Sequence, residues 1–253
     1  MPRPDPIFEC RLAQTDAEAK AAQSLRYDVF VRELGADGPL VDHAAGLEKD
    51  AYDQHAKQLL LFDRARPEGA QVVGVYRLID NDAAQGRFYS AAEYDLGPLQ
   101  SSGRRLLELG RSCLHRDYRG GAAMMHLWQG LARVVAETRA EILFGVASFH
   151  GTDTAALAQP LSLLRAKHLA PDGLRVRSKA YAPMDLVPLA RIDRVAAMRQ
   201  TPALIKAYLR LGGMVGDGAF VDYGFNTTDV CLIMDTARLN PRRKMIYAAG
   251  AAG

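Results

Sequence analysis

The sequence contains few of the features that mark secreted, metal-binding or membrane-spanning proteins. Among its 253 residues are only three cysteines, Cys10, Cys113 and Cys231, which stand far apart. An odd number of widely spaced cysteines fits neither a disulfide framework nor a metal site, so we expect a reducing compartment and no bound metal. The N-terminal residues lack the apolar core of a signal peptide, and no apolar run is long enough to span a bilayer. We therefore expect a cytoplasmic protein, and peripheral contact with the inner membrane stays open.

A strong excess of charge of either sign is also missing. Lys and Arg total 32 while Asp and Glu total 29, which leaves a formal net charge of +3. Such a small excess does not by itself indicate a nucleic-acid partner, and we expect none. Hydrophobic residues make up 49% of the chain, which is ample for a core. Neither an internal repeat nor a linker divides the sequence, so we expect a single domain over residues 1–253.

Apolar periodicity predicts strands and helices in mixed order. One helix should run through residues 17–34, with Thr15 or Asp16 as its N-terminal cap. Residues 87–100 show no regular pattern. Because strands and helices are mixed along the chain, the fold class should be α/β (or α+β). Strands are expected at 7–13, 58–63, 70–79, 141–148, 214–223 and 228–235, and further helices at 201–211 and from Thr152 or Asp153 to about 167.

The stretch from Leu106 to Leu131, LLELGRSCLHRDYRGGAAMMHLWQGL, is expected to organise the fold. Its first part alternates, with leucines on both sides of Glu108, which is typical of a strand with one buried face. A Gly120-Gly121 turn follows, and residues 122–139 repeat apolar side chains with helical spacing. A helix that begins after such a turn presents free N–H groups and the positive end of its dipole, where phosphate binds well. The same pattern also fits an ordinary connection without a ligand.

Several short motifs occur in an order that is found in one group of acyltransferases. RYDVF at 26–30, the spacing ExDxxD at 48–53, GVYRL at 74–78 and ELGR at 108–111 resemble the acyl-homoserine lactone synthases and their relatives among the GNAT-like acyltransferases. A closer resemblance is to the L-ornithine N-alpha-acyltransferases. It rests on ELGRSC, LWQGL, LFGVASFHGTD, LRVRS and the long block LIKAYLRLGGMVGDGAFVDYGFNTTDVCLIM. The similarity covers the chain from about Leu25 to Met234.

This resemblance implies a GNAT-like fold in which helices flank a central mixed sheet. The core would lie at about 7–170 and a family-specific C-terminal extension at about 171–240. The implied reaction moves a (3-hydroxy)acyl group from acyl carrier protein to the α-amine of L-ornithine and gives lyso-ornithine lipid. The donor would be the acyl-phosphopantetheine of the carrier protein, with no cofactor bound. Two alternatives stay open: an acyl-homoserine lactone synthase-like enzyme, and a non-catalytic protein that binds lipid or carrier.

Two positions depart from the family patterns. GNAT enzymes usually hold the donor pyrophosphate with Arg-x-x-Gly-x-Gly or Ala, whereas GGAAM follows Arg119 here. This departure argues against free acetyl-CoA and leaves a phosphopantetheine arm on a carrier protein as donor. Gly35 stands where the lactone synthases usually have tryptophan. That difference weakens the lactone synthase alternative.

The implied chemistry needs a base, because an acceptor ammonium must lose a proton before or during attack on the thioester. Glu108, on the predicted strand, is the candidate base, acting directly or through a water molecule. Backbone N–H groups at Arg111 or Ser112 are candidates for stabilising the oxyanion. Alternatively, Glu108 only pairs with Arg111 or with a neighbouring strand. Cys113 should lie on the opposite face of the strand and be buried.

Charged side chains near these elements supply candidates for substrate binding. Arg116, Arg119, Gly120 and Gly121 lie in the turn before the helix and could hold the pantetheine phosphate, although solvated loop arginines fit as well. Ornithine carries one carboxylate and two ammonium groups, so a site of mixed charge would suit it. The candidates for acceptor binding are Arg26, Glu48, Asp50, Asp53, Arg77, Ser148 and His150. The charged ones among them could instead fix the first helix to the sheet.

A basic run from Arg165 to Lys179 includes Asp172 as its single acid. Acyl carrier proteins are acidic, so this run could form the complementary docking face. It could equally approach anionic lipid. A solvated surface would explain the same run without any partner.

Overall fold

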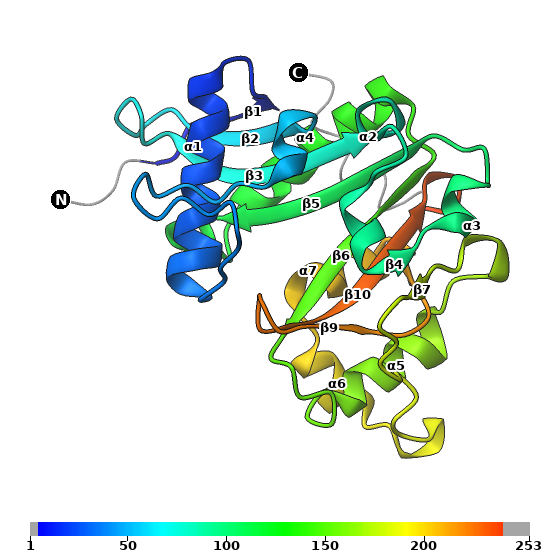
Figure 1. Cartoon of the computed structure of the whole chain (residues 1–253). Helices are drawn as coiled ribbons and strands as arrows, with labels where there is room; N and C mark the ends of the chain where they lie inside the picture. Colours follow the sequence, from blue (N-terminus) through cyan, green and yellow to red (C-terminus); the bar gives the residue numbers. More distant parts are fainter. Residues whose placement is uncertain (1–4, 240–253) are drawn as a thin grey trace. The chain divides into compact units, whose positions relative to one another are not determined.

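The structure is a computed structural model that describes residues 5–239 of the chain. It forms two compact units. Among the described residues, the first unit contains 5–79 and 109–139, and the second contains 80–108 and 140–239. Strand β5 (Leu106–Leu114) passes from the second unit into the first after Glu108 (Figure 1). The single-domain assignment stays a prediction.

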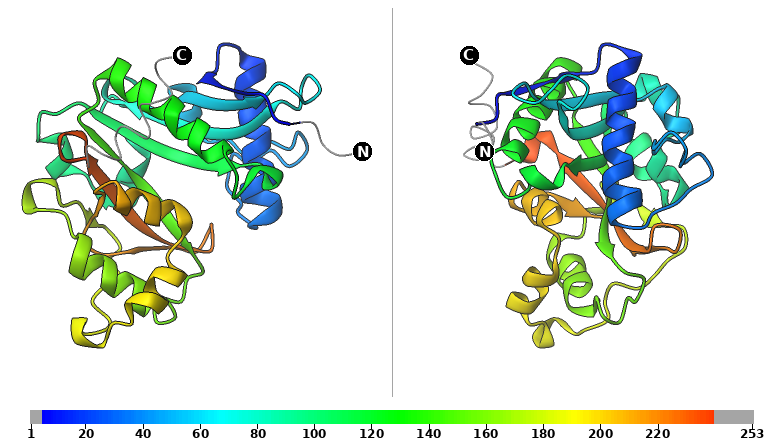
Figure 2. Two further views of the ribbon diagram at one scale, coloured as in Figure 1. Left: turned by 180° about the vertical axis from the view of Figure 1, so that it is seen from behind. Right: turned by 90° about the vertical axis from the view of Figure 1, so that its left-hand side faces the viewer.

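The first unit is an antiparallel sheet covered by a helix on each face. Strands β1 (Phe8–Leu12), β2 (Lys57–Asp63) and β3 (Val72–Asp80) pair in this order, and β5 follows β3. Helix α1 (Asp16–Arg26) packs on one face, and α4 (Ala123–Thr138) covers the other (Figure 2). Neighbouring residues of β2 alternate between the two helices, as a strand with a period of two requires.

Side chains of the sheet explain this layering. Leu60 and Val75 form one core cluster with Ala22 and Leu25 of α1. On the other face α4 approaches so closely that a Cβ on Gly130 would lie 2.2 Å from the Cys10 sulfur. A larger residue at position 130 would therefore push α4 away from β1.

The prediction of a helix after Thr15 is confirmed at its start and needs correction at its end. The Thr15 hydroxyl accepts a hydrogen bond from the Glu18 N–H, 3.2 Å away, and caps α1. The helix does not continue as a regular α-helix to Leu34. Residues Tyr27–Glu33 form the π-helix η1, whose wider turns an apolar repeat of 3.6 residues cannot distinguish.

The second unit is built around two long strands. β6 (Ile142–His150) pairs antiparallel with β10 (Thr227–Asp235) along its whole length. The first residues of β5 lie parallel to β6, with Leu106 opposite Ile142 and Glu108 opposite Phe144. The short strands β8 (Met214–Val215) and β9 (Phe220–Asp222) pair with β10. A separate pair joins β4 (Tyr94–Asp95) and β7 (Arg177–Ser178).

Helices surround these strands. The main ones in the second unit are α5 (Ala158–His168), α6 (Arg194–Gln200) and α7 (Ala203–Arg210). Among residues 5–239, no helix combines the length and the apolarity needed to cross a bilayer. The short helical segments of the two units are η2 (Ala51–Gln54), α2 (Asn81–Ala84), η3 (Tyr89–Ala92), α3 (Gly97–Gln100), η4 (Arg116–Tyr118), η5 (Asp172–Leu174), η6 (Leu189–Arg191) and η7 (Thr236–Arg238).

Two predictions for the second unit were wrong in detail. The helix does not begin at Thr152 or Asp153, because the Asp153 carboxylate accepts from the Ala155 N–H and closes a turn before α5. The single strand expected at 214–223 is interrupted between β8 and β9. There Gly218 has a φ of +81°, and a Cβ at that position would lie 2.4 Å from the Tyr181 ring. Backbone geometry and close packing thus end the strand early.

Strands pair in both directions, and helices cover the sheets of each unit. The predicted α/β class with a mixed sheet flanked by helices is therefore confirmed.

Candidate functional site

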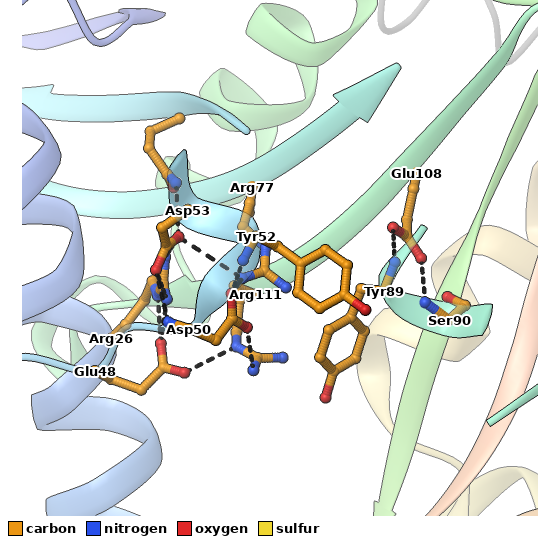
Figure 3. A network of polar contacts seen from close by, with 11 residues as sticks. Arg26, Glu48, Asp50, Tyr52, Asp53, Arg77, Tyr89, Ser90, Glu108 and Arg111 are labelled. Carbon is orange, nitrogen blue, oxygen red and sulfur yellow. Dashed lines mark hydrogen bonds and ion pairs between the residues drawn. The ribbon is translucent and has the colours of Figure 1, made fainter. Parts of the chain in front are cut away.

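Buried charges from four elements meet in the first unit (Figure 3). Arg26, at the end of α1, is fully buried. Its guanidinium donates to Glu48 at 2.5 Å and to both carboxylate oxygens of Asp53 at 2.7 and 2.9 Å. A guanidinium buried this deeply requires such partners, because an unpaired charge in the interior is very costly.

The network continues onto the sheet. Arg77 of β3 donates to Asp50 at 2.6 Å. Arg111 of β5 donates to Glu48 and to Asp50, each at 3.0 Å. The three guanidinium groups thus face three carboxylates, so the network is close to neutral. The Asp50 and Arg111 side chains are its most accessible members, with 21% and 11% of their surface exposed.

The spacing of the carboxylates has a local cause. The Asp50 side chain accepts from the Tyr52 N–H at 2.8 Å, and Asp53 accepts from the Asp50 N–H at 3.1 Å. This reciprocal pair is a capping box at the start of η2. Burial alone would raise the pKa of Asp53, but the hydrogen bond and the charge of Arg26 outweigh it, so this pKa lies below its usual value. The carboxylate therefore stays ionised at neutral pH.

Arg111 adopts an unusual backbone conformation inside a strand. Its φ is +50°, in the left-handed region that non-glycine residues seldom enter. Such a residue costs on the order of 1 kcal/mol or more and persists where the surroundings hold it. Here the two carboxylates of the network hold its side chain. Residues in strained conformations concentrate at functional sites, so this geometry draws attention to Arg111.

Glu108 lies in the second unit and is 2% exposed. Its two carboxylate oxygens accept from the Tyr89 N–H at 2.7 Å and from the Ser90 N–H at 2.6 Å (Figure 3). These amides begin η3, where N–H groups have no partner within the helix. Glu108 therefore organises the preceding loop, whether or not it also accepts a proton.

Cys113 and Ser112, on the same strand as Glu108, differ in burial. Cys113 is buried, as predicted, and burial raises the pKa of its thiol to about 12. A thiol with so high a pKa is a poor nucleophile at neutral pH. Ser112 is partly buried on the same strand.

The glycine turn leads into α4 as the sequence predicted. Gly120 has a φ of +77°, and α4 begins at Ala123 without a side-chain cap at Ala122. Arg119 lies beside this helix start, but its guanidinium is 2.8 Å from the Glu33 carboxylate. Arg116 is far more open, since 76% of its side chain is exposed. The turn thus combines uncapped N–H groups with two arginines, which suits an anion.

The structure places Ser148 and His150 away from Glu108 within the second unit. They do not follow β6 but belong to it, opposite Asp229 and Thr227 of β10. Ser148 lies four residues beyond Phe144, the partner of Glu108, which corresponds to roughly 13 Å along a strand. The strand predicted at 141–148 does lie beside the Glu108 strand, but it extends through His150, two residues further than its apolar run indicated.

Much of the basic run from 165 to 179 is paired internally. Arg165 and Arg177 donate to Asp217 at 2.5 and 2.9 Å. Arg175 lies 2.7 Å from Asp172, and Lys179 donates to the Ala91 carbonyl oxygen at 2.5 Å. Spacing along the sequence could not reveal Asp217, which lies on the segment between β8 and β9. The positive charge available to a partner is therefore smaller than the sequence indicates.

Sequence reasoning missed a carboxylate group in the second unit. Glu93, Asp222 and Asp229 each place one oxygen within 4.8 Å of the others. Glu93 and Asp229 are buried, and Tyr94 next to them donates to the Asp229 carbonyl oxygen at 2.9 Å. Carboxylates this close favour a shared proton or a cation between them, so these residues could hold a cation. Each comes from a different element, and no sequence spacing signals the cluster.

Comparison with known proteins gives consistent matches. The acetyltransferase (GNAT) domain profile matches residues 25–129. The L-ornithine N(alpha)-acyltransferase of Rhodobacter capsulatus is 56% identical over 250 residues, which cover 97% of this chain and 96% of that protein. The protein of the same name from Brucella abortus is 41% identical over 252 residues, covering 96% and 90%. These matches confirm the resemblance found in the sequence.

A solved structure shows the same fold at low identity. The CoA-dependent acyl-homoserine lactone synthase BjaI, determined with MTA, has a TM-score of 0.55 and 14% identity to this chain. The alignment covers 96% of this chain and 89% of that one. At this identity the similarity shows the fold alone, and it confirms the GNAT-like class.

Proposed function

Because this chain belongs to the family of L-ornithine N(alpha)-acyltransferases, we propose that it acylates the α-amine of L-ornithine with acyl carrier protein as donor. The main support for this proposal is the 56% identity to a protein of that name over 97% of this chain. In the reaction an amide bond forms to the α-nitrogen and the thioester C–S bond breaks. The phosphopantetheine thiol leaves with one proton, and the product is an N-acyl-ornithine, lyso-ornithine lipid.

Glu108 is our candidate for the group that takes the proton of the α-ammonium. Its carboxylate is held at two points by the Tyr89 and Ser90 amides, so its position is fixed before substrate arrives. In the reaction the carboxylate would accept this proton directly or through a water molecule. Backbone N–H groups of Arg111 and Ser112 remain our candidates for the oxyanion. The left-handed conformation of Arg111 interrupts the regular strand there and supports this choice.

For the donor, we assign the pantetheine phosphate to the start of α4. Gly120 and Gly121 leave the backbone open there, and Arg116 and Arg119 bring positive charge to the same turn. Helix N–H groups and guanidinium groups together favour a phosphate. Arg119 would have to share its charge with Glu33.

For the acceptor, we assign contact to the exposed end of the buried charge network, at Asp50 and Arg111. Asp50 offers an anion and Arg111 a cation, and both side chains retain accessible surface. Arg26, Glu48, Asp53 and Arg77 are more deeply buried and bonded to one another, so their contribution to acceptor binding would be indirect. A zwitterionic amino acid matches such a mixed end, because its carboxylate and an ammonium can each find an opposite charge.

Release of free thiol from 3-hydroxyacyl carrier protein tests the proposal. We expect release that depends on L-ornithine, with N-acyl-ornithine identified by mass spectrometry. The same acyl group presented on CoA should give much slower release at equal concentration. Release that requires S-adenosylmethionine would instead indicate a lactone synthase. No release with ornithine, lysine or S-adenosylmethionine would contradict an acyltransferase function.

A further inference from the structure

Large apolar side chains protrude from one short segment of the second unit. Leu186, Leu189 and Val195 expose 39%, 50% and 68% of their surface. They belong to the turn before η6, to η6 itself and to the first turn of α6. Single exposed apolar residues are common, but several so close along one segment indicate a contact surface.

Helix α6 directs its apolar side chain outward. Ala197 is fully buried, and the helix packs against α5. Val195 precedes Ala197 by two residues, so it lies on the opposite side of the helix. Arg199 follows Val195 by four residues and shares its face. An aliphatic and a basic side chain are thus presented together.

Unpaired arginines accompany the apolar side chains. Arg191, Arg194 and Arg199 are exposed, and within residues 5–239 none of them makes an ion pair or a side-chain hydrogen bond. Both acids of the segment are engaged elsewhere. Asp185 lies 3.5 Å from Arg165, and Asp193 accepts from the first N–H groups of α6 as its cap. The segment therefore carries a net positive charge, with three exposed arginines against Asp193.

We propose that this segment is a membrane-docking surface that binds the anionic leaflet of a bilayer. We call it the arginine–leucine surface, and it comprises Leu186, Leu189, Arg191, Arg194, Val195 and Arg199. Aliphatic side chains enter the boundary between headgroups and acyl chains, while guanidinium groups remain with the lipid phosphates. Together they supply the two signals that peripheral binding requires.

The choice of lipid over an acidic carrier protein follows from the exposed aliphatic groups. An electrostatic carrier contact would use the arginines but would leave Leu189 and Val195 unexplained. The proposed function, on which this step rests, adds a chemical reason. Its product carries one acyl chain on a charged headgroup, and such an amphiphile belongs in a bilayer. Docking at the arginine–leucine surface brings the enzyme that makes this product to the membrane.

Vesicle sedimentation of the full chain, without substrates, tests the surface. Vesicles of phosphatidylcholine mixed with phosphatidylglycerol should bind the protein, and vesicles of phosphatidylcholine alone should bind much less. The R191Q/R194Q variant should weaken binding to the anionic vesicles by about 25-fold, roughly fivefold for each arginine. L189S/V195S should weaken binding as well, and its loss should persist at high salt because it is not electrostatic.

A matched variant separates position from net charge. K20Q/R32Q also removes two exposed positive charges, both from the first unit, and should bind vesicles like the wild type. Unfolding midpoints of all three variants should match the wild type, because the substituted side chains are exposed. Absent wild-type binding, or equal loss in K20Q/R32Q, would overturn the proposal. So would an R191Q/R194Q variant that keeps vesicle binding and loses binding to acyl carrier protein. The vesicle assay requires no turnover, so it is independent of whether ornithine is the acceptor.

Discussion

At the scale of single residues, the backbone contacts of Glu108 mean that Glu108→Gln should affect stability as well as activity. Both of its oxygens accept from backbone amides. Replacement by Gln turns one acceptor into an NH₂ donor that faces an amide donor. We therefore expect Glu108→Gln to lower the free energy of unfolding by roughly 1–3 kcal/mol. Chemical denaturation measures this loss.

The kcat of Glu108→Gln then distinguishes a general base from a purely structural role for Glu108. If Glu108 takes the proton, kcat per folded molecule should fall by about 10² to 10⁴ and recover in part at higher pH, where more acceptor amine is free. Asp235→Asn is the matched control, since it weakens another buried carboxylate of the second unit, bonded to Arg104 at 2.6 Å. Near-normal kcat in folded Glu108→Gln enzyme at neutral pH would remove Glu108 as the base.

The buried network leads to a prediction about stability and pH. Arg26→Met leaves Glu48 and Asp53 without their main cation, which should cost about 3–5 kcal/mol near neutral pH. The folded-state pKa of Asp53 is lowered, so the stability it contributes is present above its unfolded pKa of about 3.9 and is lost as pH falls through the folded value. The difference between variant and wild type should therefore shrink below about pH 4.

Urea denaturation at a series of pH values measures this effect. Arg32→Met is the matched control, because Arg32 pairs with Asp28 at 2.7 Å while 67% of its side chain is exposed. Exposed pairs contribute only about 0–1 kcal/mol, so this control should change stability little. Equal losses in the two variants would mean that burial does not set the strength of the Arg26 contacts.

At the scale of elements, the start of α4 carries the donor prediction. Arg119→Ala should raise the KM for the acyl carrier protein donor by about tenfold or more and leave the KM for ornithine nearly unchanged, because a charged hydrogen bond is worth roughly 1.5–3 kcal/mol. Glu33→Gln breaks the same ion pair but keeps the guanidinium. Initial rates for both variants test this, and an altered ornithine KM in Arg119→Ala would contradict the phosphate assignment.

Elements with strong local signals were predictable from the sequence. The Thr15 cap, strands β2, β3 and β5 and helix α4 depend on apolar period, capping residues and glycine positions, all of which are local. The π-turns of η1 and the left-handed Arg111 were not predictable. The apolar repeat of 3.6 residues does not distinguish π-turns, and the carboxylates that hold Arg111 are distant from it in sequence.

At the scale of the whole molecule, charge pairing decides how much of each basic surface is available. The sequence marked the run from Arg165 to Lys179, but Asp217 and Asp172 lie against three of its arginines. Segment 186–199 drew no attention in the sequence, because its charges are fewer. Its arginines have no such partners in the described part of the chain. Partners brought by the fold, and not local charge density, determine which surface can attract another molecule.

This pairing sharpens the last prediction, which concerns carrier docking at the basic run. R175A/R177A/K179A should raise the KM for acyl carrier protein at low salt by a few-fold and weaken its salt dependence, because steering charges act mainly on encounter. The effect should stay small, since two of these side chains are already in ion pairs. R175K/R177K/K179R keeps the charges and alters the local bonds, so it should retain the wild-type KM. Steady-state rates across a salt series measure both variants. A KM unchanged by the alanine variant at low salt would remove this run from the docking face, and a raised KM in the charge-conserving variant would assign the effect to local structure instead of steering.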